Sequence, residues 1–203
     1  AYALVSELFN SGSKPKLGIH ETAVISAGVK VSKTASIGAN VVLGKNVIIG
    51  EKSIIGPNSS IGDGSIIGDN CKIFSNVSIY HGVTIGNRVT IHSCSVIGGD
   101  GFGFAHDSRH WVKIHQLGGV IIGNRVEIGS CTTIDRGALS DTVIEDGVIL
   151  DNHIQIAHNV HIGENTAIAG CSGISGSTEI GKNCIFAGQT GIVGHLKICD
   201  GVT

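Results

Sequence analysis

An aliphatic residue recurs at every sixth position along most of this chain, and this spacing constrains the fold more than any other feature. The series runs without a break from Ile19 to Ile97 and again from Ile144 to Ile198, where Phe186 takes one of the places. An α-helix cannot use it, because six residues at about 100° each turn the face by roughly 240°. In a strand, side chains alternate between two faces, so positions i and i+4 of each hexad point the same way. The sequence therefore predicts short strands, each with two inward side chains, joined by tight turns.

Three hexads make one triangular coil of eighteen residues, and stacked coils would fill the interior with columns of aliphatic side chains. Each buried Ile or Val contributes about 1.5–3 kcal/mol. Coils stack about 4.8 Å apart. The predicted fold class is all-β, a parallel β-helix shaped as a triangular prism. Gly follows the aliphatic residue in many hexads, and we expect it to supply backbone conformations that other residues avoid, at positions 38, 44, 50, 56, 62, 68, 86 and 98.

Composition excludes several classes of protein. The net charge is −2 and no basic stripe is present, so we expect no nucleic acid partner. No apolar run approaches 18 residues, so we expect no stable membrane insertion. No secretory signal is visible, and the six Cys residues show no metal-site spacing, so a cytoplasmic location with reduced thiols is expected.

The two ends of the sequence differ from the repeat. Residues 2–9 resemble a short amphipathic helix, followed by a linker at 10–16. The expected organisation is a trailing helix and linker from a missing N-terminal domain at 1–18, followed by the hexapeptide-repeat β-helix at 19–203. The last hexad stops in the middle at Thr203, which would leave an open rung. We therefore expect a β-helix truncated at its C-terminus, from the middle of a longer protein.

One long insertion interrupts the repeat at residues 99–121. It holds Phe102, Phe104 and Trp111, whereas a floppy segment would be rich in Ser, Glu and Pro. Loops of this length inside a compact array are usually functional, so we expect a ligand or subunit contact here. The loop also holds three His residues, but their spacing is weak evidence for a metal and favours solvated surface histidines.

A second informative stretch runs from residue 132 to 163, where polar residues exceed what turns require. His158 lies at a turn, and Gly176 lies one coil along on the same edge. His195 lies two coils along, about 10 Å from His158 at the coil spacing. This arrangement suits acyl transfer, because it brings together a base (His158), a backbone N–H that no side chain covers (Gly176) and a second imidazole (His195). A turn glycine flanked by surface histidines explains the same pattern equally well from spacing alone.

The motifs in these stretches, taken in order, resemble the UDP-3-O-acylglucosamine N-acyltransferase family of lipid A biosynthesis. The matching segments are IYHGV (79–83), IGGDGFGFA (97–105), TTIDRGAL (132–139), LDNHIQIAHNV (150–160) and GHL (194–196). The resemblance implies a left-handed helix and transfer of an (R)-3-hydroxyacyl chain to the 2-amino group of UDP-3-O-acyl-glucosamine. It implies no metal and no resident cofactor, because the phosphopantetheine of acyl carrier protein carries the acyl group. It also implies a homotrimer with active sites between adjacent prisms.

The resemblance assigns roles to individual residues. His158 matches the general base, His195 the second active-site histidine and Gly176 the residue whose backbone N–H stabilises the oxyanion. The polar residues expected around that site are Asp151, Asn152 and Gln155. From the aromatic loop, we expect Phe102 and Phe104 to line the substrate groove between subunits.

Three other functions compete with this interpretation. One is an acetyl-CoA-dependent sugar N-acetyltransferase with the same repeat. Another is a zinc γ-class carbonic anhydrase, since His153 and His158 have its ligand spacing, although Leu117 stands where a third ligand is needed. The last is a non-enzymatic β-helix, such as an ice-binding or scaffold protein, which would repeat one face monotonously.

Overall fold

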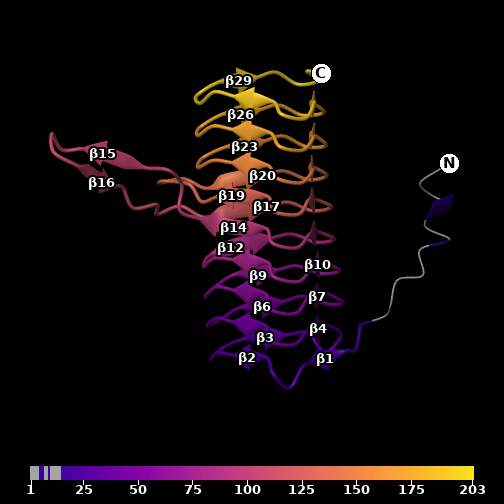
Figure 1. Cartoon of the computed structure of the whole chain (residues 1–203). Coiled ribbons are helices and arrows are strands. Elements are labelled where there is room, and N and C mark those ends of the chain that lie inside the picture. Colours follow the sequence, from indigo (N-terminus) through magenta and orange to yellow (C-terminus); the bar gives the residue numbers. More distant parts are fainter. Residues whose placement is uncertain (1–4, 7–8, 10–14) are drawn as a thin grey trace.

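The computed structural model describes Val5, Ser6, Phe9 and residues 15–203, and the part from residue 17 on forms a stack of triangular coils (Figure 1). The expected helix at 2–9 and linker at 10–16 fall mostly outside the described residues. A two-stranded hairpin, β15 (Phe104–His106) and β16 (Trp111–Lys113), stands out from the side of the prism. Within the described residues, no helix has the length and apolar character needed to cross a membrane.

Three parallel sheets of nine strands each form the faces of the prism. The first sheet contains β1 (Gly18–Ile19), β4 (Ser36–Ile37), β7 (Ile54–Ile55), β10 (Lys72–Ile73), β13 (Thr90–Ile91), β18 (Glu127–Ile128), β21 (Ile149–Leu150), β24 (Ala167–Ile168) and β27 (Ile185–Phe186). The second contains β2 (Val24–Ile25), β5 (Val42–Leu43), β8 (Ser60–Ile61), β11 (Ser78–Ile79), β14 (Val96–Gly99), β19 (Thr133–Asp135), β22 (Gln155–Ile156), β25 (Gly173–Ile174) and β28 (Gly191–Ile192). The third contains β3 (Lys30–Val31), β6 (Ile48–Ile49), β9 (Ile66–Ile67), β12 (Val83–Ile85), β17 (Val120–Ile122), β20 (Thr142–Ile144), β23 (His161–Ile162), β26 (Glu179–Ile180) and β29 (Lys197–Ile198).

The strand register confirms the predicted period. Ile55 pairs with Ile37 on one side and with Ile73 on the other, so each coil advances the chain by eighteen residues. Two insertions lengthen this step without breaking the ladder. Ile91 pairs with Ile128 across the long loop, and Ile128 pairs with Leu150 across a shorter insertion near residue 140.

The interior is the predicted set of stacked columns. The second residue of nearly every central strand is at most 3% exposed, as in Leu43, Ile67 and Ile134. Small residues fill the space beside them, and the buried polar ones are hydrogen-bonded. The hydroxyl of Ser53 donates to the Gly68 carbonyl (2.6 Å) and accepts from the Cys71 N–H (2.9 Å). The polar positions in the core therefore tie one coil to the next rather than leaving unpaired groups.

The expectation that the repeated glycines supply unusual backbone conformations is wrong. Of the eight glycines that follow an inward aliphatic residue, only Gly98 has a positive φ, of 85°. The left-handed conformation is adopted two residues later, often by Asn, as at Asn40 and Asn46. The glycines are required because coils approach closely: a Cβ at Gly56 would lie 2.6 Å from the Phe74 backbone, and one at Gly62 would lie 2.4 Å from the His81 nitrogen.

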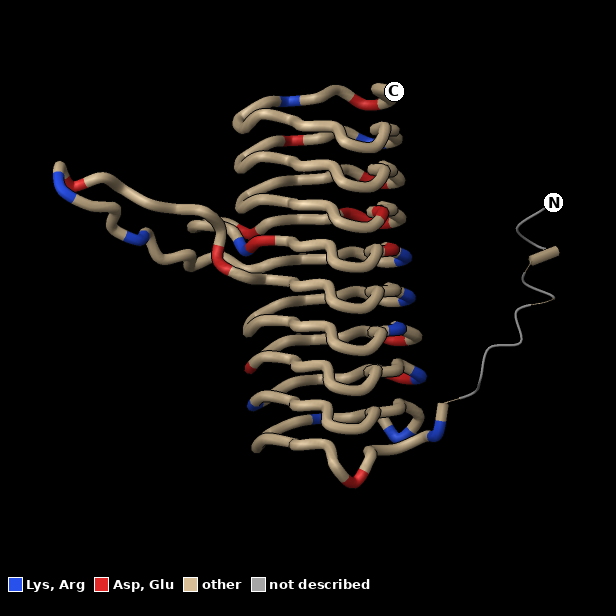
Figure 2. Tube along the Cα trace, viewed as in Figure 1, with Lys and Arg blue, Asp and Glu red and all other residues tan. Residues whose placement is uncertain are grey.

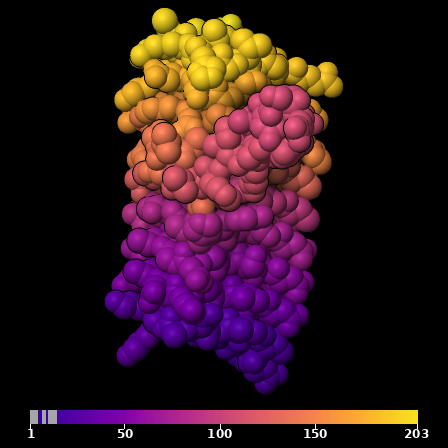
Figure 3. Space-filling view, turned by 90° about the vertical axis from the view of Figure 1, so that its left-hand side faces the viewer, coloured from indigo at the N-terminus to yellow at the C-terminus, as the bar shows by residue number. Residues whose placement is uncertain are grey.

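The turns between the third and first sheets are rich in charged residues. Figure 2 shows charges of both signs along the right-hand corner, at turns that lead from the third sheet to the first. Ion pairs there link successive coils, such as Lys182 to Glu164 (3.3 Å). The long loop leaves from the corner between the second and third sheets. In Figure 3 its pink hairpin covers the middle coils, between the indigo N-terminal and yellow C-terminal coils.

Candidate active site

Most of the predicted site residues lie at or near the corner where the second sheet leads into the third, which we call the site corner. The inward residues of successive strands pair in register, from Ile134 through Ile156 and Ile174 to Ile192. The residue two positions later therefore stacks at the same corner. That column contains Arg136, His158, Gly176 and Gly194.

His158 is half-buried between Gly176, the next residue of this column, and the long loop. A Cβ at Gly176 would lie 2.8 Å from both Cε1 and Nε2 of the His158 ring. A Cβ at Gly101, in the loop, would lie 2.6 Å from the His158 Cβ. Any side chain at either position would therefore collide with the imidazole. The two glycines let the ring lie against the backbone of the next coil on one side and the loop on the other.

The Gly176 N–H is open because of the residue one coil above it. At the corner where the third sheet leads into the first, the turn N–H is accepted by an Asp or Asn side chain from the next coil, as when Asp69 accepts from Glu51 (2.6 Å) and Asp200 from Lys182 (2.8 Å). The same cap occurs lower in the site corner itself, where Asp63 accepts from Lys45 (2.7 Å). The residue stacked above Gly176 is Gly194, which has no side chain. Within the part of the chain that the structure describes, the Gly176 N–H has no acceptor. A fixed backbone donor beside an imidazole is the arrangement that stabilises an oxyanion.

A groove of about 550 Å³ lies beside His158 on the outer face of the second sheet. Its walls include Gly101 and Ala157, which flank His158, and the aromatic rings of Phe102 and Phe104. The two rings are 5.2 Å apart, and Phe102 is 86% exposed. The groove is lined by apolar side chains from the loop and by the sheet floor around Ile174, so it suits an apolar chain with a polar end near His158.

Asp135 places one carboxyl group on the floor of this groove. Its Oδ2 accepts a hydrogen bond from the Gln155 amide (2.8 Å), and the Gln155 oxygen accepts from the Thr133 hydroxyl. Burial raises the pKa of Asp135 from 3.8 to about 6, although the Gln155 hydrogen bond and the charge of His158 act in the opposite direction and Asp100 adds to the rise. Asp135 lies in the TTIDRGAL motif, but the motif alone did not identify this carboxyl as a site residue.

Arg136 anchors the loop side of the same corner. Its side chain is almost fully buried, and both terminal nitrogens bond to His81, one to the ring and one to the carbonyl oxygen (2.5 Å). His81 lies two coils below Arg136, so the guanidinium crosses the coil of Gly98 and Gly99, where no side chain blocks it. At the mouth of the groove, Lys113 pairs with Asp100 and joins the two arms of the loop.

The remaining predicted residues are not all at this corner. His195 is there, exposed, and its N–H donates to the Gly176 carbonyl (3.1 Å). Asp151 and Asn152 lie at the other end of β22, where they accept from the N–H groups of Gly170 (3.0 Å) and Ser130 (2.7 Å). The structure thus joins His158, Gly176, His195 and Gln155. It separates Asp151 and Asn152 from them by a strand, and their role near His158 stays a prediction.

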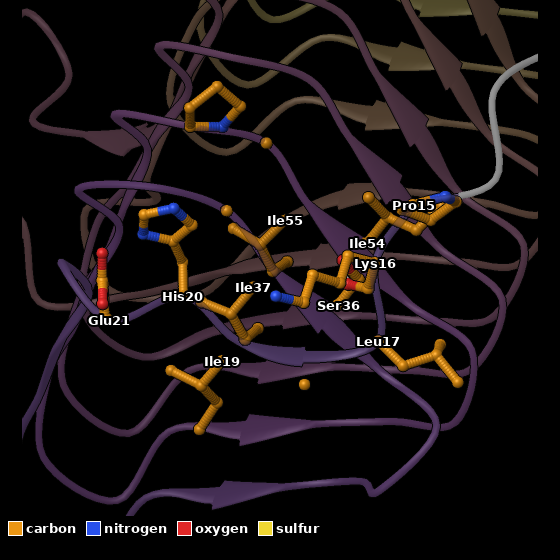
Figure 4. A pocket seen from close by; sticks show the side chains of 14 residues that line it. Pro15, Lys16, Leu17, Ile19, His20, Glu21, Ser36, Ile37, Ile54 and Ile55 are labelled. Carbon is orange, nitrogen blue, oxygen red and sulfur yellow. The ribbon is translucent and has the colours of Figure 1, made fainter.

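Two other features lie away from this corner. A pocket of about 510 Å³ is formed where residues 15–21 cross β4 and β7, at the N-terminal end of the prism (Figure 4). None of the predicted site residues lines it. His153 and His158, the pair considered for zinc, lie at opposite ends of β22 and do not converge within one chain.

Comparison with known proteins decides the family. The model of the bacterial transferase hexapeptide family (six repeats) matches residues 34–67, 64–99 and 141–176, about half of the chain. The chain belongs to this family. It is also 54% identical over 202 residues to the UDP-3-O-acylglucosamine N-acyltransferase of Pseudomonas savastanoi pv. phaseolicola, and 50% identical to that of Coxiella burnetii. The resemblance inferred from the motifs is therefore confirmed.

These alignments cover nearly all of this chain but only part of the relatives. The chain spans 58% of the Pseudomonas protein and 59% of the Coxiella protein. Among solved structures, a UDP-N-acetylglucosamine O-acyltransferase from Moraxella catarrhalis has 26% identity and a TM-score of 0.62, covering 89% of this chain and 62% of that one. The Arabidopsis UDP-N-acetylglucosamine acyltransferase has 23% identity and a TM-score of 0.76, covering 90% and 66%. The fold class is confirmed as a left-handed parallel β-helix.

The raised pKa of Asp135 predicts a stability difference that grows with pH. Because its folded pKa is about 6 and its ordinary value is 3.8, the folded chain binds the extra proton between these values. Ionisation in the groove therefore opposes folding as pH rises through this window. We expect Asp135→Asn to raise the melting temperature relative to wild type more at pH 7.5 than at pH 4.5.

Asp146 provides the control of opposite sign. Hydrogen bonds from Asn124 hold the pKa of Asp146 below its usual value, so its ionised form favours the folded state. Because both the folded and the unfolded carboxyl are ionised above about pH 4, Asp146→Asn should be less stable than wild type by a nearly constant amount between pH 4.5 and 7.5. Thermal unfolding of both variants across this pH range checks the prediction. A pH-independent difference for Asp135→Asn would contradict it.

Proposed function

We propose that the protein to which this chain belongs transfers an (R)-3-hydroxyacyl group from acyl carrier protein to the 2-amino group of UDP-3-O-acyl-glucosamine, in the cytoplasmic synthesis of lipid A. The observation that carries the proposal is the His158 imidazole against Gly176, whose N–H is open, at the edge of an apolar groove. The names of the relatives, UDP-3-O-acylglucosamine N-acyltransferases, support the sugar acceptor, and the carrier-protein donor is part of the proposal.

The reaction requires a base and a site for developing negative charge. The sugar amine attacks a thioester only as the free base, and an imidazole is suited to take up its proton near neutral pH. His158 receives the proton from the amine as the N–C bond forms. The Gly176 N–H donates to the oxygen that becomes negative in the tetrahedral intermediate. When the C–S bond breaks, the proton passes from His158 to the phosphopantetheine thiolate.

The groove supplies binding for the acyl chain in this proposal. Phe102, Phe104 and Ala157 offer an apolar surface, and Asp135 and Gln155 offer polar groups near its reacting end. His195, two coils above His158, lies where it can bind or orient a polar substrate group. No protein nucleophile, resident cofactor or metal takes part. Cys184 is buried, and Cys171 lies at a different corner from His158.

Replacing His158 tests the base assignment. His158→Ala should lower kcat by about 10²–10⁴, because a general base contributes that much, while leaving the fold intact. The side chain lies on an outer turn, so its loss opens no cavity among the core columns. Release of carrier protein is measured with 3-hydroxyacyl carrier protein and the UDP-linked amino sugar, using the full-length gene product because the relatives are longer than this chain.

His153→Ala is the matched control, since it removes the same side chain from the other end of β22. It should retain turnover. Normal turnover by His158→Ala would show that the base is another group. A wild-type preference for acetyl-CoA over acyl carrier protein would replace the proposed activity with a sugar N-acetyltransferase.

Replacing Gly194 tests the oxyanion donor without touching His158. Gly194→Asn should cap the Gly176 N–H as Asn152 caps Ser130, and lower kcat by about 10²–10³. Gly188→Asn is the control, because it stacks above Gly170, whose N–H is already accepted by Asp151. Equal turnover in the two variants would argue against Gly176 as the donor.

A homotrimer is part of the proposal, and the hairpin supports it. Trp111, on the hairpin that stands off the prism (Figure 1), is 68% exposed, and Leu117, where the loop returns to the prism beside Ala138, is 75% exposed. Apolar surface of this kind marks an interaction site. We expect sedimentation to give a trimer and Trp111→Ser to weaken it. Trp111 is the sole Trp, so its emission should shift to the red on dissociation. A monomer with red-shifted emission at all concentrations would count against the trimer.

A further inference from the structure

Asn159, next to the proposed base, hydrogen-bonds to its ring. The Asn159 Oδ1 lies 3.0 Å from the Nδ1 of His158. Either end of a side-chain amide can face an imidazole, and each choice implies a different ring tautomer. The tautomer that Asn159 imposes on His158 therefore depends on the other hydrogen bonds that orient the Asn159 amide.

Three contacts fix the orientation of that amide. Its nitrogen donates to the carbonyl oxygen of Ser140 (2.8 Å) and to the Ser140 hydroxyl (2.9 Å). Its oxygen accepts from the Ala138 N–H (2.9 Å). Flipping the amide would set oxygen against the carbonyl and NH₂ against the N–H, which would lose both bonds. The group facing His158 is thus an acceptor, so the Nδ1 of His158 must carry a proton.

This leaves the lone pair of neutral His158 on Nε2. That nitrogen lies against Gly176, since a Cβ added there would be 2.8 Å from it. The basic atom therefore faces the backbone whose N–H is open. With the other tautomer, Nε2 would carry the proton and could not accept one from a substrate amine.

The short insertion near residue 140 supplies the contacts that hold Asn159. Both Ala138 and Ser140 belong to it, and the Asn159 N–H donates to the hydroxyl of Thr142 where it ends (2.8 Å). The insertion folds tightly, because a Cβ at Gly137 would lie 1.6 Å from the Ser140 carbonyl oxygen.

We propose that Asn159 is a positioning residue that holds His158 in the Nδ1–H tautomer, and that the insertion at residues 137–141 serves to orient the Asn159 amide. The catalytic consequence rests on the proposed function. The tautomer itself does not, because it follows from the hydrogen bonds alone.

Imidazole ¹⁵N NMR of the chain reads the tautomer directly, with His158→Ala to assign the signal. In wild type, neutral His158 should be mainly Nδ1–H. In Asn159→Ala it should shift towards Nε2–H, with kcat of the full-length protein lowered at least about tenfold and KM little changed. Asn159→Asp should restore part of kcat and move the acidic limb of its pH profile to higher pH, because a carboxylate stabilises the imidazolium.

A control separates positioning from backbone strain. Asn159 and Asn165 have φ of 60° and 56°, so replacing either with Ala forces the same unfavourable conformation. Asn165→Ala should leave the tautomer and kcat unchanged. An Nε2–H tautomer in wild type, or equal losses in the two Ala variants, would overturn the inference. Normal turnover in His158→Ala, together with an Nδ1–H tautomer of His158 in wild type, would reject only the proposed function.

Discussion

The close stacking of coils through one parallel backbone ladder is the constraint on which the rest of the molecule depends. Outside the two insertions, each residue of a coil lies against the residue eighteen positions away, so a side chain at a turn meets the turns directly above and below it. The same ladder that excludes a Cβ at Gly56 also brings the His158 ring onto Gly176. Scaffold and site therefore obey one spacing rule.

This rule explains why so much could be predicted from the sequence. A period of six identified the inward columns, and multiplication by three placed Gly176 and His195 at the corner of His158. The expected role of the glycines was wrong, because a period shows that Gly recurs but does not distinguish an unusual φ from close packing. In this chain close packing decides, and Asn takes the left-handed turn position instead.

The parts of the site that sequence did not identify lie where the period breaks. Asp135 pairs in register with Gly99, at the point where the long loop begins, and Asn159 is held by Ala138 and Ser140 from the short insertion. Spacing cannot place an inserted residue against its neighbours. The signals available were two motifs, residues 132–139, which contain Asp135 and Ala138, and residues 150–160, which contain Asn159. Contacts set by the regular ladder could be predicted from the sequence, and contacts set by the insertions could not.

The site corner differs from the other corners as much by missing side chains as by added ones. At the corner between the third and first sheets, Asp and Asn side chains from the next coil accept turn N–H groups and so link successive coils. At Gly176 and Gly194 this acceptor is absent, and the backbone there can serve a ligand instead. The local hydrogen bond that is given up would contribute only about 0.5–1.5 kcal/mol. A long stack with many such bonds can lose one at little cost to the fold, and this lets a rigid structural repeat carry a reactive site.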